Sequence, residues 1–211
     1  MHCDPAADPV AQGIYGEQIR LLYAQAPLSA VASLLVAPLL VLVSWDALPH
    51  SVLMTWLGLL ELTAVVRLAL TAAFQRRPDP GDAIEHWAIC YTWACAASGV
   101  CWGGCAILLA LSPSLVYDTF IALMLGGVMM GGVFTLAPIL KTYIAYALPL
   151  ALPPVLWLLL HGDPLRGIMG MTGALYLLLA LGAAYRYHDA LIRSLRLAQE
   201  KSELACSYAV A

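Results

Sequence analysis

The sequence predicts an all-α integral membrane protein, a polytopic bundle of six transmembrane helices with a C-terminal cytoplasmic juxtamembrane helix. Composition is the first reason: 62% of the 211 residues are hydrophobic, only 11% are charged, and the mean hydropathy is +0.83. A soluble domain has ~45–50% apolar and ~25% charged residues. Length is the second reason, because six spans of roughly 20 residues each use more than half of the chain. The net charge of −3 gives no support for nucleic-acid binding.

Six apolar runs of near-spanning length are separated by Pro, Gly and charged clusters. They lie at about 28–45, 51–74, 86–111, 116–137, 142–160 and 167–185. Backbone amides in lipid need hydrogen-bond partners within their own segment, and the runs lack the alternation of barrel strands, so we expect helices. The resulting division is an N-terminal cytoplasmic segment (1–26), a six-helix transmembrane domain (27–185) and a cytoplasmic signalling-type helix and tail (186–211).

The two flanking segments have helical patterns of their own. Residues 14–25 place apolar side chains at helical spacing beside polar ones, which predicts either a helix at the membrane interface or an extension of the first span. Residues 186–205 form an amphipathic pattern in which Leu191, Leu195, Ala198 and Ser202 follow steps of four and three. Such a seam is compatible with a homodimer through 186–205, and the alternative is a basic stop-transfer tail.

Basic residues near the ends of the spans predict the orientation, because Lys and Arg resist translocation. One side carries Arg20, Arg76, Arg77, Lys141, Arg186, Arg193, Arg196 and Lys201, and the other carries only Arg166. We therefore expect a multi-pass protein of the bacterial inner membrane with both termini in the cytoplasm. The three loops on the outer side are all short.

Two ionisable residues lie inside the second span, where a charge is costly unless it has a partner. Glu61 and Arg67 are six residues apart, so they do not face each other on a helix. For Arg67 we favour an anchor that extends toward the inner headgroups. For Glu61, a ligand or signalling role and a hydrogen bond within the bundle stay equally open. Asp118, near the outer end of the fourth span, is expected to be a solvated helix cap.

Glycine pairs four residues apart occur in the third and fourth spans, as Gly99 with Gly103 and as Gly127 with Gly131. This spacing lets helices approach closely. We therefore expect the third and fourth helices to form the tight centre of the bundle, together with Trp102. A lipophilic ligand pocket beside the neighbouring methionines of the fourth span is the weaker alternative.

Chemistry by this chain alone is not expected, since it contains no nucleotide-binding, serine-hydrolase or zinc-protease motif. Cys90, Cys101 and Cys105 share one face of the third span, and we interpret them as packing residues rather than a metal or redox site. The outer loops contain Asp46, His50, His161 and Asp163, which could hold a divalent metal if these loops meet, but ordinary loop roles are favoured. We expect no catalytic residue, no cofactor and no bound metal.

Several stretches together resemble a known type of membrane domain. They are QIRLLYAQAPLSAV, CWGG, FIALMLGGVMMGG, HGDPL and RYHDALIRSLRLAQEKSEL. Over about residues 15–205 the chain is similar to the membrane-embedded, MASE-like N-terminal sensor region of bacterial hybrid sensor histidine kinases and related diguanylate cyclases. In such proteins the helix that leaves the last span continues through a coiled coil into the effector.

The resemblance implies a sensory input module in the lipid bilayer, without catalytic activity of its own. After Leu204 the chain reads ACSYAVA, so the effector kinase or cyclase domain is expected to be missing from this chain. Two other functions stay open. One is a small transporter or permease subunit, with Glu61, Arg67 and Asp118 along a polar pathway, and the other is a passive membrane anchor.

Overall fold

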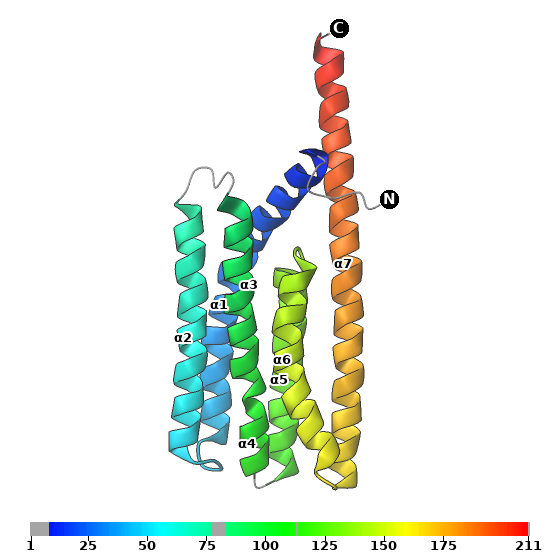
Figure 1. The fold of residues 1–211 in the computed structure, drawn as a ribbon. Coiled ribbons are helices and arrows are strands. Elements are labelled where there is room, and N and C mark those ends of the chain that lie inside the picture. Colours follow the sequence, from blue (N-terminus) through cyan, green and yellow to red (C-terminus); the bar gives the residue numbers. More distant parts are fainter. Residues whose placement is uncertain (1–8, 77–82, 113, 211) are drawn as a thin grey trace.

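The computed structural model describes residues 9–76, 83–112 and 114–210, with side chains described from Gly13 to Lys201 outside the same gaps. In this part of the chain all regular structure is helical (Figure 1). The helices are α1 (Pro9–Ser44), α2 (His50–Gln75), α3 (Ile84–Gly103), α4 (Cys105–Leu111), α5 (Leu115–Leu136), α6 (Leu140–Leu160) and α7 (Pro164–Val210). By length and composition, six segments could cross a membrane, with α3 and α4 together forming the third. The predicted all-α, six-span fold class is confirmed.

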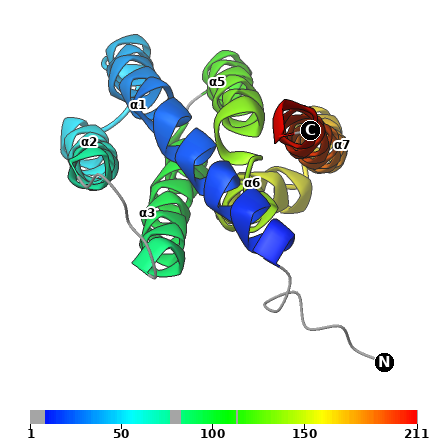
Figure 2. The ribbon, with the colours of Figure 1, turned by 90° about the horizontal axis from the view of Figure 1, so that it is seen from above.

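The six spans form a closed ring when seen along the bundle, in the order α1, α2, α3, α6, α7 and α5 (Figure 2). Each helix contacts the next one around the ring, and α5 also contacts α6. Outward faces are strongly apolar: Trp93, Val116 and Leu160 are 72%, 76% and 81% exposed. An apolar exterior of this kind suits a bundle surrounded by lipid.

Helix α1 continues without a break from residues 14–25 into the first span. The second of the two sequence interpretations, a helical extension, therefore describes this segment. Its N-terminal part leans across one end of the bundle toward α7 (Figures 1 and 2). The apolar side chains predicted for an interface are instead buried in the protein, with Ile19 and Leu22 at 0% exposure and Tyr23 at 1%.

The third span is interrupted, where the sequence predicted one uninterrupted helix. α3 ends at Gly103 and α4 begins at Cys105, because two consecutive glycines weaken the helix and a side chain enters its hydrogen-bond ladder. The indole Nε1 of Trp56 donates to the carbonyl oxygen of Cys101 at 2.8 Å. The break is thus stabilised from α2.

Helix α7 is a single helix of 47 residues. It includes the sixth span and the predicted amphipathic segment from residue 186, and it extends well beyond the other helices (Figure 1). The α1–α2 and α6–α7 connections lie at the opposite end of the bundle. Assigning the α7 end to the cytoplasm rests on the distribution of Lys and Arg, of which Arg77 lies outside the described residues. The side chain of Ser202, one member of the predicted dimer seam, is also outside them.

Candidate functional site

The most unusual polar group inside the bundle is the guanidinium of Arg67 on α2. Its side chain is not extended toward the headgroups as predicted but is buried, with 2% exposure. Nη2 donates hydrogen bonds to Ser29 Oγ of α1 and, at 3.4 Å, to the hydroxyl oxygen of Tyr91 on α3. The guanidinium carbon lies 5.8 Å from the centre of the Tyr91 ring. Hydroxyl and aromatic partners on neighbouring helices therefore replace water, which makes burial possible where the sequence suggested an extended anchor.

Arg67 has no carboxylate partner among the described residues. Their ion pairs within 4.0 Å join Glu17 to Arg20, Asp118 to Arg166 and Asp189 to Arg193. The Nε of Arg67 is buried and has no hydrogen-bond partner within this part of the chain. Arginine keeps its charge inside proteins, and a buried charge without a counter-ion is costly. The site is therefore one where an anion would be stabilised.

A cavity of about 330 Å³ lies beside Arg67, mainly between α1 and α5. Apart from Arg67, its lining is apolar or weakly polar and contains no carboxylate. Two lining residues that frame it, Leu28 of α1 and Leu123 of α5, are 70% and 71% exposed, so the cavity reaches the outer surface of the bundle. In a membrane this surface faces acyl chains.

Gly127 and Gly131 line this cavity, and they do not pack against another helix. A Cβ added at either position would meet nothing within 4 Å. The prediction that this glycine pair packs against the third span is therefore wrong. The pair instead keeps one wall of the cavity open.

Gly99 and Gly103 do form a close helix contact, but their partner is α6. A Cβ at Gly99 would overlap the carbonyl oxygen of Tyr146, and one at Gly103 would overlap that of Pro149. Spacing alone predicted the close approach correctly, but it did not identify the neighbour. Trp102 is fully buried beside this contact and packs edge-on against Trp56, with ring centres 5.6 Å apart.

Asp118 is buried, so the prediction of a solvated cap is wrong. Its side chain has 0% exposure and accepts a 2.8 Å hydrogen bond from Nε of Arg166, at the start of α7. The Arg166 guanidinium also lies over the Trp157 ring, 5.5 Å from its centre. This ion pair joins the N-terminal ends of α5 and α7. Arg166, which stood alone among the basic residues in the sequence, is therefore the partner of Asp118.

Glu61 is partly buried on α2, and its Oε1 atom is buried without a hydrogen-bond partner in the described part of the chain. It contributes to neither the Arg67 site nor the Asp118 pair. A ligand or signalling role and a hydrogen bond within the bundle both stay predictions for Glu61.

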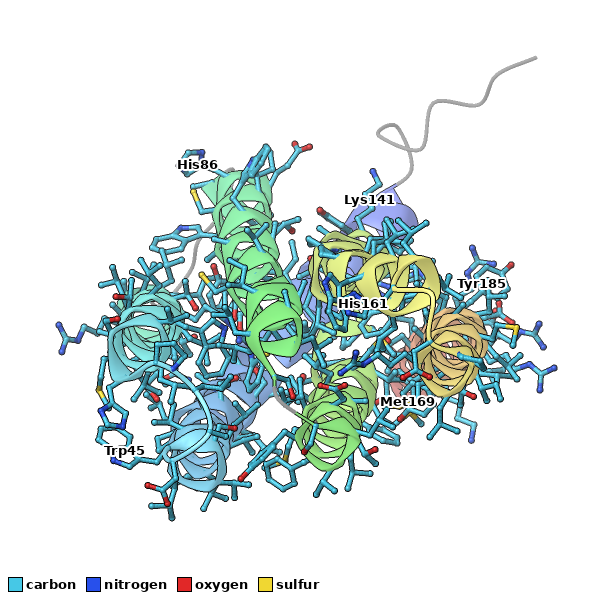
Figure 3. All side chains as sticks on the ribbon, turned by 90° about the horizontal axis from the view of Figure 1, so that it is seen from below. Trp45, His86, Lys141, His161, Met169 and Tyr185 are labelled. Atoms are coloured by element: carbon cyan, nitrogen blue, oxygen red, sulfur yellow. The ribbon has the colours of Figure 1, made fainter. Side chains whose placement is uncertain are left out.

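The outer-loop residues are not gathered into a metal site. His50 stacks on Trp45, with ring centres 4.2 Å apart, and His161 packs against Trp157 at the same distance. Figure 3 shows Trp45 and His161 on well-separated parts of the bundle. Among the described residues no three His, Cys, Asp or Glu side chains are close enough together to hold a metal ion.

A second cavity, of about 540 Å³, lies between α5, α6 and α7. It has no charged residue in its lining. The Tyr176 hydroxyl of α7 donates a hydrogen bond to the Gly126 carbonyl oxygen of α5 at 3.1 Å and so links these two helices. The Arg67 cavity is the better candidate for a specific site, because it alone of the two combines an apolar wall with an uncompensated charge.

No protein-family model, no curated protein and no solved structure matches this chain.

Proposed function

We propose that this chain is a membrane-embedded sensory input module of a two-component or cyclic-dinucleotide signalling system, with the inner part of α7 as its output element. The observation that carries the proposal is the continuity of α7, which runs as one helix from the end of the bundle at the α6–α7 connection to well beyond the opposite end. A continuous helix can transmit a tilt, rotation or translation without loss at a hinge. The resemblance to sensor regions supports the same function.

The contacts of α7 support this role, because both helices that border the Arg67 cavity also touch α7. From α1, Gly13 lies against Gln199, whose Nε2 would be 3.2 Å from an added Cβ. From α5, the C-terminal end lies against His188, whose Nδ1 is 3.1 Å from the carbonyl oxygens of Ala137 and Pro138. A change in the spacing of α1 and α5 would therefore alter the packing around α7.

A transporter pathway receives less support from the same residues. Asp118 is neutralised by Arg166 at the outer rim, whereas Arg67 is held by Ser29 and Tyr91 between α1 and α3. Asp118 and Arg67 therefore do not line one continuous polar pathway. Glu61 contributes to neither set of contacts.

The test is a fusion of the chain, after Leu204, to a histidine kinase core, with autophosphorylation measured in membranes. Substituting Gly127→Leu fills the cavity wall without a clash, and we expect it to shift the output. Gly58→Leu on α2 is the matched control, because an added Cβ at Gly58 also meets nothing within 4 Å, and Gly58 lies outside both cavities and outside α7. Dimerisation through 186–205, part of the same proposal, is measured by crosslinking of the fusion.

Output that is constant across stimuli and equal in both variants, in a correctly inserted fusion, would refute the sensory role and favour a passive anchor. Substrate uptake by proteoliposomes of the isolated chain would instead establish a transporter.

A further inference from the structure

We propose that the cavity between α1 and α5 binds a long-chain carboxylate, with the carboxylate paired to Arg67 and the hydrocarbon chain lying along the Gly127–Gly131 wall. The argument for binding rests on the site itself and is independent of the proposed function. That such a molecule is the stimulus of the module is a further step, which rests on the proposed function.

The head group is inferred from the charge of the site. Arg67 is almost fully buried, its Nε has no partner in the described part of the chain, and no described carboxylate lies within ion-pair distance. A guanidinium pairs with a carboxylate through two parallel N–H···O bonds. A ligand carboxylate would therefore supply the counter-ion that the surrounding hydroxyl groups of Ser29 and Tyr91 do not.

The depth of Arg67 favours a small head over a phospholipid head group. Arg67 precedes Gln75, the last residue of α2, by eight positions, which places it about 12 Å along the helix axis from that end. At this depth the cavity is lined by apolar side chains on most sides. To reach Arg67, a phospholipid would have to draw its phosphodiester, its glycerol and two acyl chains below their normal level in the bilayer. A single-chain acid would have to move only its carboxylate inward.

The tail is inferred from the shape of the wall. Glycine is unfavourable inside a helix unless the missing side chain serves a purpose, and Gly127 and Gly131 serve no helix contact. Both lie between Leu123 and Phe134, which are 71% and 55% exposed. The result is an apolar channel that opens sideways to lipid, so an acyl chain can enter from the bilayer and extend back into it. A volume of about 330 Å³ is within the range of small-molecule sites.

The experiment measures selectivity within a bilayer. The full chain is reconstituted in phosphatidylcholine vesicles, and electron paramagnetic resonance follows the motionally restricted fraction of three probes: spin-labelled stearic acid, its methyl ester and spin-labelled phosphatidylglycerol. We expect the acid to be preferred over the ester by roughly 10- to 100-fold, the range for a hydrogen bond to a charged group. Phosphatidylglycerol should show no such preference.

Four variants assign the binding to this cavity. Arg67→Gln should abolish the preference of acid over ester, and Arg67→Lys should retain part of it. Gly131→Leu should remove binding of the acid by filling the channel, and it touches none of the contacts that hold Arg67. Gly58→Leu, the matched control on α2, should bind the acid as the unchanged chain does.

Equal binding of acid and ester, or acid binding that survives Gly131→Leu, would overturn the proposal. Selection of phosphatidylglycerol as strong as that of the acid would replace the carboxylate by a lipid head group. The kinase fusion separates the two proposals. Selective binding of the acid together with phosphorylation that stays constant across all stimuli refutes the sensory role alone. Phosphorylation that responds to another stimulus, without selective binding of the acid, refutes the carboxylate site alone.

Discussion

Replacing Gly103 by alanine tests the closest helix contact in the bundle. The added Cβ would overlap the carbonyl oxygen of Pro149 on α6. This oxygen has no helical N–H donor, because the residue four positions later is Pro153, which lacks one. Gly103 of α3 packs against this oxygen instead. A carbon–oxygen contact of this type is normally no closer than about 3.3 Å, so α3 and α6 would have to separate by on the order of 1 Å.

The expected cost follows from a comparison with Gly58→Ala. Gly58 is on α2, and a Cβ there would meet nothing within 4 Å. Both residues are helical, so each substitution gains up to ~1 kcal/mol of helix propensity, and the overlap is the main difference between the two variants. Overpacking of a tight core contact costs about 1–3 kcal/mol. We therefore expect Gly103→Ala to unfold more easily than Gly58→Ala by this amount.

The measurement is reversible unfolding in mixed micelles with an increasing fraction of sodium dodecyl sulfate, followed by far-ultraviolet circular dichroism. Fluorescence of the tryptophans at the contact, which include Trp102, reports local loosening in the same samples. If the two alanine variants unfold at the same detergent fraction, the α3–α6 contact is not the tight contact that the structure describes.

Three further substitutions have defined outcomes. Asp118→Asn should lower the free energy of unfolding by about 3 kcal/mol, because it leaves Arg166 without its partner. Adding Arg166→Gln to this variant should then cost little more. If the losses of the two single variants simply add in the double variant, the ion pair is contradicted. Trp56→Phe should cost about 1 kcal/mol by removing the hydrogen bond to the Cys101 carbonyl, and an unchanged unfolding midpoint would argue against a side-chain stabilised break. His188→Ala should change basal phosphorylation of the kinase fusion by freeing α7 from the end of α5, and wild-type output would disprove that coupling.

The positions of the six candidate spans could be predicted from the sequence because each span is a local property. A helix in lipid satisfies its own backbone hydrogen bonds, so length and hydropathy were sufficient to locate six spans. The break before Cys105 was not predictable in the same way. It depends on Trp56, which is 45 positions from the carbonyl that it binds.

The environments of the charged residues could not be predicted from the sequence, because they too depend on residues that are distant along the chain. Arg67 is equally compatible with an extended anchor and with burial, and the outcome depends on Ser29 and Tyr91 of two other helices. Asp118 and Arg166 are 48 positions apart. Neither residue signals the other along the chain, so only the packing of α5 against α7 shows that they neutralise each other.

The unbroken α7 has a mechanical consequence. Its 47 residues correspond to a rod of about 70 Å at 1.5 Å per residue, and the ion pair between Asp118 and Arg166 holds this rod near its first turn. With the fulcrum at that end, one degree of tilt displaces the far tip by about 1 Å. A helix held at one end in this way has the geometry of a lever, in which a sub-ångström displacement near the fulcrum corresponds to several ångströms at the tip.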